Sequence, residues 1–586
     1  ASQVPYYDSR SPYSFFRYIQ SGSGEQVFEI SYSRSLGKNF SIGAAYERFA
    51  SNRIVGPGSS GGSDANLVEH NATRFFARYQ TEDARYHLLV AIVNTRHRAV
   101  EQGGIQPLNT EATPSDLFNY DREAVYLTGA INTDDRDQLH LFHSYRLLGR
   151  GLTAYHVLDL QRQYNGYVDN AIPRATAETA QYFPNVPIDT LLYYPRVLRN
   201  RNTTADRSTY RQAENTLGLT GHTDHIEYNV YARYRGAWWR ANSTVTANGT
   251  PGVGFVGSEE VIAHGFGQLF VGGTAAFNYR TIYAVEVAGE YLPYDSNPYT
   301  QRPIKVLGVN SEYWLRGRIR TGPLSAELLT MSAAPTLTQL EFVGNHYSWN
   351  RAAAFTDGNG TDLGNNFRNT RTTQLTVRAQ QRLPLLADHA IDASLALVNI
   401  SNLVYYGYNP SRYASTTYYP TKSINLMSGP QQLGDGDSKK LLIVAARHRF
   451  RVGKVFFINQ GTYTQGGDGA GLRIPALVGE SRVYYQTHVF RKALLGQVGA
   501  EVYYQSAFRA YGYSPSTQQF YVQDGFTIPK YAVASAFLTA DIKAATIFLK
   551  MAYLNQGIGQ DGYFASPYYS AYPRRFQFGV RWRFFT

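Results

Sequence analysis

The last stretch of the chain, Arg574 to Thr586, alternates between two kinds of side chain. Every second position from Phe576 to Phe584 is apolar, and the positions between them are Arg, Gln or Gly. Successive side chains of a β-strand point to opposite faces, so this strand would have one aromatic face and one basic face. Inside a globular core the arginines would be buried without partners. The pattern fits an edge strand of a soluble sandwich, and it fits better a wall between lipid and water.

The same alternation returns through the middle of the chain, at 40–47, 226–235, 374–382 and 497–505. An arginine facing lipid costs about 2–4 kcal/mol at the bilayer midplane, so the polar face of each strand must face an aqueous or protein-filled lumen. A further arginine series lies on one face of a strand that begins near Lys439. The residues that we predict to line this lumen are Glu227, Arg233, Arg235, Arg378, Arg382, Arg447, Arg449, Arg451, Glu501, Arg581 and Arg583.

The connections between these segments alternate between short and long. Tight turns fall near Thr81–Asp83, Gly149–Gly151 and Thr321–Pro323, and long polar loops fall near 165–207 and 334–369. Bacterial barrels have short periplasmic turns and long extracellular loops, whereas a sandwich or propeller would show more even connections. Counting with this alternation gives an even number of strands and returns both termini to the periplasm.

We therefore predict an all-β fold, a single large transmembrane antiparallel β-barrel of about 22 strands (range 16–24) in the outer membrane. The barrel would span 12–586, after a periplasmic lead-in at 1–11. The segment from Val125 to Ile131 breaks the rhythm, and we assign it to a loop.

Composition supports this architecture. The chain of 586 residues has 48 Tyr and 31 Phe but only 3 Met and no Cys, with a mean hydropathy of −0.35. Aromatic residues are typical of strands, and the lack of Cys excludes disulfides and thiol chemistry. No run of about 18 uncharged apolar residues is present, which leaves a closed barrel as the way to span a membrane. Because Ala1 is not a translation start and no signal peptide is present, we expect a mature, exported form.

The net charge is +12, and the 56 basic residues comprise 10 Lys and 46 Arg. A basic protein suggests nucleic-acid binding, but no long basic run or tail exists and the arginines are spread singly along strands. Arginine binds carboxylate or phosphate through a planar fork. The lumen arginines would either attract anionic solutes by their field or pair with carboxylates such as Glu227, Glu501 and Asp392 and stiffen the wall.

No motif for catalysis emerges. His143 and Ser144 are adjacent in a strand and point to opposite faces, and no histidine accompanies Ser394 and Asp392. His140, His143 and His156, or His222, Asp224 and His225, do not make a convincing zinc set. Asp357, Asn359 and Asp362 are weak candidates for a Ca²⁺ site, because Asp/Gly runs are ordinary in turns. We expect no enzyme activity and no required cofactor or metal.

Several stretches resemble a known family. The segments 11–20, 24–30, 37–43, 101–105 and 154–167 are similar to the putative porins of Bacteroidota. The spacing of Gln577, Gly579, Trp582 and Phe584 resembles the C-terminal assembly signal of bacterial outer-membrane barrels. These resemblances imply an outer-membrane barrel.

The leading functional hypothesis is a porin-like channel for passive diffusion of hydrophilic solutes, with a preference for anions. The loops at 165–207 and 334–369 would fold into the lumen and narrow it, because an open barrel of this size would leak. The alternatives are the barrel of a TonB-dependent transporter without its plug, and a structural or assembly barrel occupied by a partner protein or lipoprotein. The expected partners are outer-membrane lipid and lipopolysaccharide and small hydrophilic solutes, and nucleic acid is not expected.

Overall fold

The computed structural model describes residues 12–56, 66–106, 114–120, 123–148, 151–177, 188–189, 191–243, 261–279, 283–299, 304, 311–351, 367–384, 386–408, 425–434 and 436–584. The predicted lead-in at 1–11 and the calcium candidates Asp357, Asn359 and Asp362 lie outside these residues.

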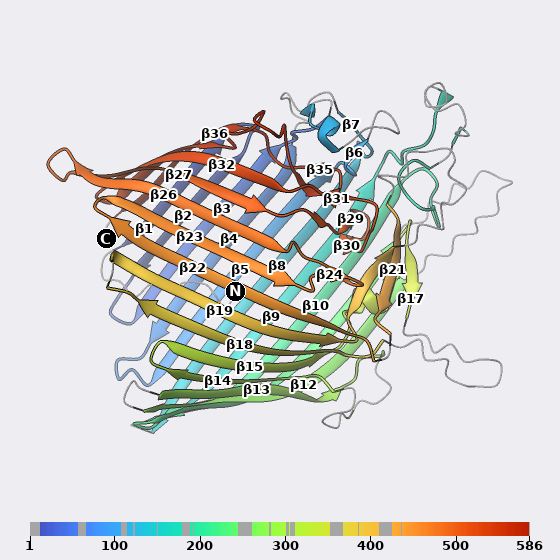
Figure 1. The fold of residues 1–586 in the computed structure, drawn as a ribbon. Coiled ribbons are helices and arrows are strands. Elements are labelled where there is room, and N and C mark those ends of the chain that lie inside the picture. The colour runs from blue at the N-terminus through green and yellow to red at the C-terminus, as the bar shows by residue number, and fades with distance from the viewer. Residues whose placement is uncertain are drawn as a thin grey trace.

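One closed antiparallel sheet of 22 strands dominates the molecule (Figure 1). Each strand pairs with its neighbour along the chain, and β36 closes the ring by pairing with β1, with Trp582 opposite Phe16. The prediction of an all-β barrel with about 22 strands is confirmed. The strands are β1 (Tyr13–Ser21), β2 (Gln26–Ser35), β3 (Phe40–Asn52), β4 (Asn66–Gln80), β5 (Tyr86–Glu101), β8 (Ala130–Leu148), β9 (Leu152–Asp169), β10 (Thr204–His222), β11 (Ile226–Ser243), β12 (Val261–Tyr279), β13 (Tyr283–Asp295), β14 (Tyr313–Thr321), β15 (Leu324–Ala333), β18 (Thr370–Arg382), β19 (Ala387–Ser401), β22 (Ser438–Val452), β23 (Val455–Gln465), β26 (Leu477–Val489), β27 (Leu494–Gln505), β32 (Tyr531–Ile542), β33 (Ala545–Ala552) and β36 (Arg575–Phe584).

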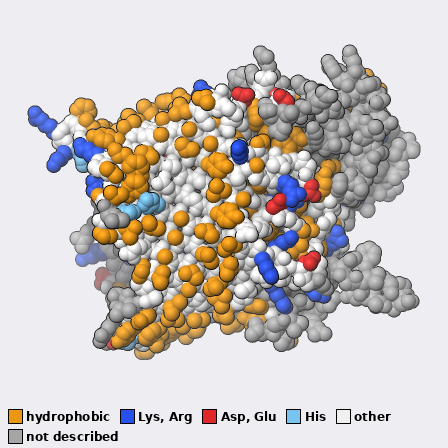
Figure 2. Space-filling model, viewed as in Figure 1, with side chains coloured by type: hydrophobic (Ala, Val, Ile, Leu, Met, Phe, Trp, Pro, Cys, Tyr) orange, Lys and Arg blue, Asp and Glu red, His pale blue; other side chains and the backbone are white. Residues whose placement is uncertain are grey.

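The alternation of the sequence becomes the two faces of this wall. Leu217 and Phe576 expose 64% and 50% of their surface on the outer face, whereas Arg233 exposes only 17% of its side chain on the inner face. Figure 2 shows one side of the molecule, where hydrophobic side chains are spread over the strands and charged ones lie mainly toward the two ends. An apolar outer band with a polar interior is the arrangement that a bilayer requires of a barrel.

The connections differ between the two ends of the barrel. At the turn end, β2 joins β3 through 36–39 and β22 joins β23 through 453–454. At the loop end, β9 joins β10 through 170–203 and β15 joins β18 through 334–369. The start of β1 and the finish of β36 both lie at the turn end. The predicted division into short turns and long loops is confirmed.

Short strands and helical turns lie at the loop end, at the right of Figure 1, together with buried apolar clusters. They are β6 (Ile105–Gln106), η1 (Pro114–Leu117), β7 (Ala124–Val125), α2 (Leu337–Leu340), β16 (Glu341–Val343), β17 (Ser348–Asn350), β20 (Val404–Tyr408), β21 (Met427–Gln432), β24 (Asp468–Gly469), β25 (Leu472–Arg473), β28 (Phe508–Arg509), β29 (Gly512–Ser514), β30 (Gln519–Tyr521), β31 (Thr527–Ile528), β34 (Phe564–Ser566) and β35 (Tyr569–Ser570).

The assignment of Val125–Ile131 to a loop is wrong at its end. Ala130 and Ile131 begin β8 and pair on one side with Glu101 and Val100 and on the other with β9. Two-sided pairing outweighs the weak local pattern, and Ala130 is fully buried.

Among the described residues, none of the helices has the length and apolar character needed to cross a membrane.

Candidate functional site: the lumen and its loop cap

Four loops pack against one another at the loop end. We call the described residues 191–203, 334–351, 425–434 and 506–530 the loop cap. Asn425 connects its own loop to the other three: its backbone N–H donates to the carbonyl of Tyr193, its side chain donates to Ser514, and its carbonyl accepts from Tyr347. Tyr347, Met427 and Tyr521 form an apolar cluster at the same place. The loops therefore fold as one packed layer.

The cap reaches across the barrel mouth. Gln518, from the loop between β27 and β32, donates to Asn132 on β8 at 2.8 Å and accepts from Asn165 on β9 at 3.4 Å. Asn132 in turn donates to Glu101. Because β27 and β8 lie almost opposite each other in the ring of strands, these contacts connect the two sides of the barrel.

Gly344-Asn345-His346 is a fully buried part of the cap. The His346 ring lies parallel to Tyr194 at 3.6 Å between centroids and is fully buried. Its Nδ1 donates to the carbonyl of Arg196 at 2.8 Å, so Nε2 accepts from the hydroxyl of Thr204 at 2.7 Å. Burial lowers the pKa of His346 to about 4, so this imidazole is neutral at neutral pH.

The same segment rests on the inner wall. Leu337 and Val343 pack against Trp239 of β11 and Ile262 of β12. Glu341 accepts from His264 of β12 at 3.1 Å. The N-cap Thr336 and Gln339 form a capping box that starts α2. Residues 334–343 therefore lie within the barrel mouth.

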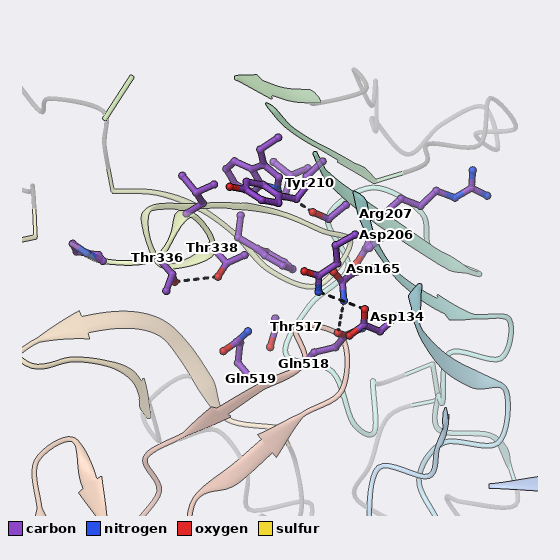
Figure 3. Close-up of a pocket in the computed structure, with 18 of the residues that line it drawn as sticks. Asp134, Asn165, Asp206, Arg207, Tyr210, Thr336, Thr338, Thr517, Gln518 and Gln519 are labelled. Carbon is purple, nitrogen blue, oxygen red and sulfur yellow. Dashed lines mark hydrogen bonds between the residues drawn. The ribbon is translucent and has the colours of Figure 1, made fainter. Parts of the chain in front are cut away.

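A cavity of about 680 Å³ remains between the cap and the inner wall of β8 to β12 (Figure 3). Its floor and sides mix aromatic and polar groups, including Tyr210, Trp239 and Gln268. Arg136 is held there by a two-pronged contact with Asp134, at 3.0 and 2.6 Å. Paired charges, amides and aromatic rings around one cavity suit a hydrophilic solute better than an apolar one.

A second polar region lies on the inner wall toward the turn end. Two neighbouring cavities of about 380 and 510 Å³ share Asp392 and Arg447 in their lining. Asp392 binds Arg378 through both oxygens and also accepts from Gln380 at 2.8 Å. Arg382 and Arg449 line the smaller cavity with Arg447. None of these three arginines forms an ion pair within the described residues.

A family model described as "Putative porin" matches residues 1–586 of the chain. The chain belongs to this porin family. Its location is therefore the outer membrane, and its general role is transport through that membrane. No curated protein matches the chain significantly.

Solved structures share the fold of this porin at low sequence identity. The copper transporter OprC matches with a TM-score of 0.66 and 10% identity, over 99% of this chain and 81% of that one. The ferripyoverdine receptor of the outer membrane of Pseudomonas aeruginosa matches with a TM-score of 0.65 and 11% identity, over 99% of this chain and 72% of that one. The ferric-catecholate import receptor Fiu from E. coli K12 matches with a TM-score of 0.62 and 11% identity, over 98% and 82%. At such identities the likeness concerns the fold alone.

The predicted lumen residues fall into separate groups. Arg378, Arg382, Arg447 and Arg449 come together around the two turn-end cavities. Arg451, farther along the same strand, contacts Asp388 at 2.8 Å. Elsewhere, Arg581 donates to Thr546 at 3.1 Å, whereas Glu227 and Arg583 form no ion pair within the described part of the chain.

Arg233 and Arg235 belong to a network on another part of the wall, β10 to β13. Arg233 bridges Glu214 of β10 and Glu290 of β13, at 2.8 and 2.6 Å, and stacks over the ring of Phe270 at 4.0 Å. Arg235 contacts Glu214 at 2.9 Å. On this side the arginines pair with carboxylates, but the partners are not the acids that the sequence suggested.

Glu501, the other predicted acid, contacts Lys550 of β33. Only Asp392 among the three suggested acids therefore pairs with an arginine within the described residues.

The residues that resemble an assembly signal lie on the closing strand β36. Trp582 points outward and stacks on Phe584 at 4.1 Å between centroids. Gly579 faces the lumen, and a Cβ there would lie 2.1 Å from the Phe548 ring of β33, so a larger residue would require that ring to move. The role of this strand in assembly stays a prediction.

Some site residues escaped the sequence analysis. Asp134 and Arg136 lie on the inner face of β8, but every position from 132 to 138 is polar, so no alternation distinguished the inner residues from the outer ones. The capping box Thr336–Gln339 was a visible signal for α2. No sequence signal indicated that Gln518 would contact Asn132.

The histidine groups do not converge on a metal. His140 contacts Asp159 at 2.7 Å, while His143 contacts His156 at 3.0 Å on the other face of the wall. Over the part of the chain that the structure describes, no group of three or more His, Asp or Glu side chains has the arrangement of a metal site.

Proposed function

We propose that this porin is a channel for passive diffusion of hydrophilic solutes and favours anions. The observation that carries the proposal is the group of Arg382, Arg447 and Arg449, three arginines that line the turn-end cavities without an ion-pair partner among the described residues. An unpaired guanidinium on a water-filled wall raises the local concentration of anions, whereas one bound to a carboxylate contributes little field.

The arginines of the inner wall fall into two groups, one paired with carboxylates and one without ion-pair partners among the described residues. On β10 to β13, Arg233 and Arg235 are neutralised by Glu214 and Glu290 and cross-link neighbouring strands. On β18 to β22, Arg378 is neutralised by Asp392, which leaves the three unpaired arginines beside it. The first group stiffens the barrel, and the second sets the charge of the path.

The loop cap would supply the constriction. A barrel of 22 strands is wide enough to leak if its lumen is clear, and barrels of this size are generally plugged. The cap packs across the mouth and contacts both sides of the ring. Solutes would pass the polar cavity beneath the cap and then the turn-end cavities lined by Arg382, Arg447 and Arg449. In this orientation the loop end would lie outside the cell, and the turn end and both termini would lie in the periplasm.

The test is the reversal potential of the reconstituted protein in a KCl gradient across a planar bilayer. The wild type should prefer Cl⁻ over K⁺, and the triple variant R382Q/R447Q/R449Q should lose most of that preference with similar conductance. The matched control R207Q/R211Q/R240Q removes the same charge from the outer wall and should retain the wild-type selectivity. Equal selectivity in the wild type and the lumen variant would refute the proposal.

A second candidate is an energised transporter barrel, favoured by the likeness in fold to OprC and the siderophore receptors. Liposomes distinguish the two, because a passive channel swells them with sugars, amino acids or organic anions and needs no energy source. Failure of every solute to enter would favour the energised transporter. A protein that co-purifies within the barrel would favour the third hypothesis, a barrel occupied by a partner.

A further inference from the structure

A basic patch lies on the outer face of the wall, where the proposed channel has no use for it. On β9 to β11 it comprises Arg162, Arg207, Arg211 and Arg240, and all four side chains are exposed. They alternate with inward residues such as Tyr210 and Trp239, which line the cavity under the cap. Figure 3 shows the Arg207 side chain extending away from that cavity.

The register of the strands places these arginines next to one another. Arg162 of β9 is directly opposite Arg211 of β10, and Arg211 is directly opposite Trp238 of β11. Arg240 is opposite Thr209, which lies between Arg207 and Arg211 on the outer face of β10. Directly opposed side chains are about 5 Å apart at Cβ and diagonal ones about 7–8 Å, so four guanidinium groups share one small area.

Acidic side chains balance only one edge of the patch. Asp137 and Asp135 of β8 contact Arg96 of β5 at 3.0 and 3.7 Å, and Asp137 lies 3.9 Å from Arg162. Arg207, Arg211 and Arg240 have no ion-pair partner within the described residues. Like charges directly opposite on one face of a sheet destabilise it, so an anion between these arginines would relieve that repulsion.

The level of the patch on the wall matches that of lipid headgroups. On β9 the outward residues from the turn end are Leu152, Ala154, His156, Leu158 and Leu160, and the first arginine or acid in this row is Arg162. Ten residues separate it from Leu152, which is about 25 Å of height for a tilted strand at 3.3 Å per residue. This equals the height of the apolar band of outer-membrane barrels. On β8 and β10 the first charged outward residues from the turn end are Asp137 and Arg211, and both are paired with Arg162.

We propose that the outer face of β9 to β11 binds the phosphorylated glycolipid headgroup of the outer leaflet. Arg162, Arg207, Arg211 and Arg240 would hold phosphate through bidentate hydrogen bonds. The indole of Trp238, with 59% of its surface exposed, lies beside Arg211 and would pack on a sugar ring at the membrane interface. The proposal requires the loop end to face outward, but it is independent of what the lumen conducts.

The experiment measures the binding of monophosphoryl lipid A to the delipidated full chain in detergent by native mass spectrometry. The wild type should bind the lipid, and R162Q/R211Q/R240Q should bind it at least tenfold more weakly. The lumen variant R382Q/R447Q/R449Q removes the same charge and should bind as the wild type does. Heat-modifiable migration in a gel verifies that each variant is folded, and the single variant R211Q replaces the triple variant if that one does not fold.

Three further arms identify the source of the anion. Phosphate-free lipid A should bind weakly, which separates phosphate recognition from apolar adsorption. Inorganic phosphate at the same concentration should not compete, and phosphatidylglycerol should bind less tightly than lipid A. Equal binding of lipid A to the wild type and the outer-wall variant, full competition by inorganic phosphate, or a preference for phosphatidylglycerol would each overturn the proposal.

Discussion

Acidification should loosen the loop cap through one residue, His346. In the packed cap the ring is fully buried, stacked on Tyr194, and hydrogen-bonded through both nitrogens. A proton on Nε2 would turn the acceptor of the Thr204 hydroxyl into a second donor and would bury a charge near the Arg174 guanidinium, which also lowers the pKa of His346. The charged ring is therefore stable only where the cap has opened.

The magnitude follows from the pKa. The ordinary pKa of histidine is 6.5 and that of His346 in the packed cap is about 4. Such a difference corresponds to about 3 kcal/mol, and each unit of pKa to about 1.4 kcal/mol. Because the opened cap binds the proton more readily than the packed cap, packing is fully favoured above pH 6.5. The stabilisation is lost progressively as the pH falls from 6.5 toward 4.

Single-channel conductance in planar bilayers, recorded from pH 7.5 to 4.5, measures this loss. The wild type should open to larger conductance states as the pH falls below 6.5. H346Q, whose amide can still donate to the carbonyl of Arg196 but does not titrate, should lack the step. H222Q, at an exposed position beside the turn between β10 and β11, is the matched control and should keep it. A flat wild-type profile, or the same step in H346Q, would refute the reasoning.

Three other predictions test the wall and the cap. L375R places a charge on the outer face and should lose about 2–4 kcal/mol of folding free energy, whereas T376R places it on the inner face and should fold normally. Urea titration measures both variants, and equal losses would contradict the assignment of the faces. R233A should lower the unfolding temperature, because Glu290 then has no arginine partner within the described residues and Glu214 keeps Arg235 alone, at a cost of about 3 kcal/mol. R382A should leave the unfolding temperature unchanged, and equal shifts would contradict the stiffening role of Arg233. Deletion of 334–369 should raise single-channel conductance, and an unchanged value would exclude this loop as the constriction.

The sequence predicted the barrel because its fold depends on a local rule. A strand in a membrane wall needs alternate polar and apolar side chains, and each connection is recognised by its length alone. The period-two pattern and the lengths of the connections therefore predicted the number of strands and the turn and loop ends of the barrel. The error at Ala130–Ile131 has the same origin: pairing with β5 and β9 makes them part of a strand, and pairing is not visible locally.

The candidate site was less predictable. The sequence indicated which arginines face inward, but which of them are paired depends on neighbours across the sheet. Glu290 reaches Arg233 over the ring of Phe270 and is 57 residues away along the chain. The alternation of residues along a strand does not show such pairings. Arg233 and Arg447 were therefore both predicted as lumen arginines, although Arg233 pairs with two carboxylates and Arg447 forms no ion pair within the described residues.

By itself, then, the sequence determined that this chain is an outer-membrane barrel with a polar, arginine-rich interior, since the bilayer imposes those features on every strand separately. Only the tertiary structure decided that the long loops pack into a layer around Asn425 and His346, and that three arginines remain unpaired beside Asp392. These features depend on contacts between residues from opposite sides of the ring or from neighbouring strands. The closed barrel brings such residues together, and distance along the chain does not reveal them.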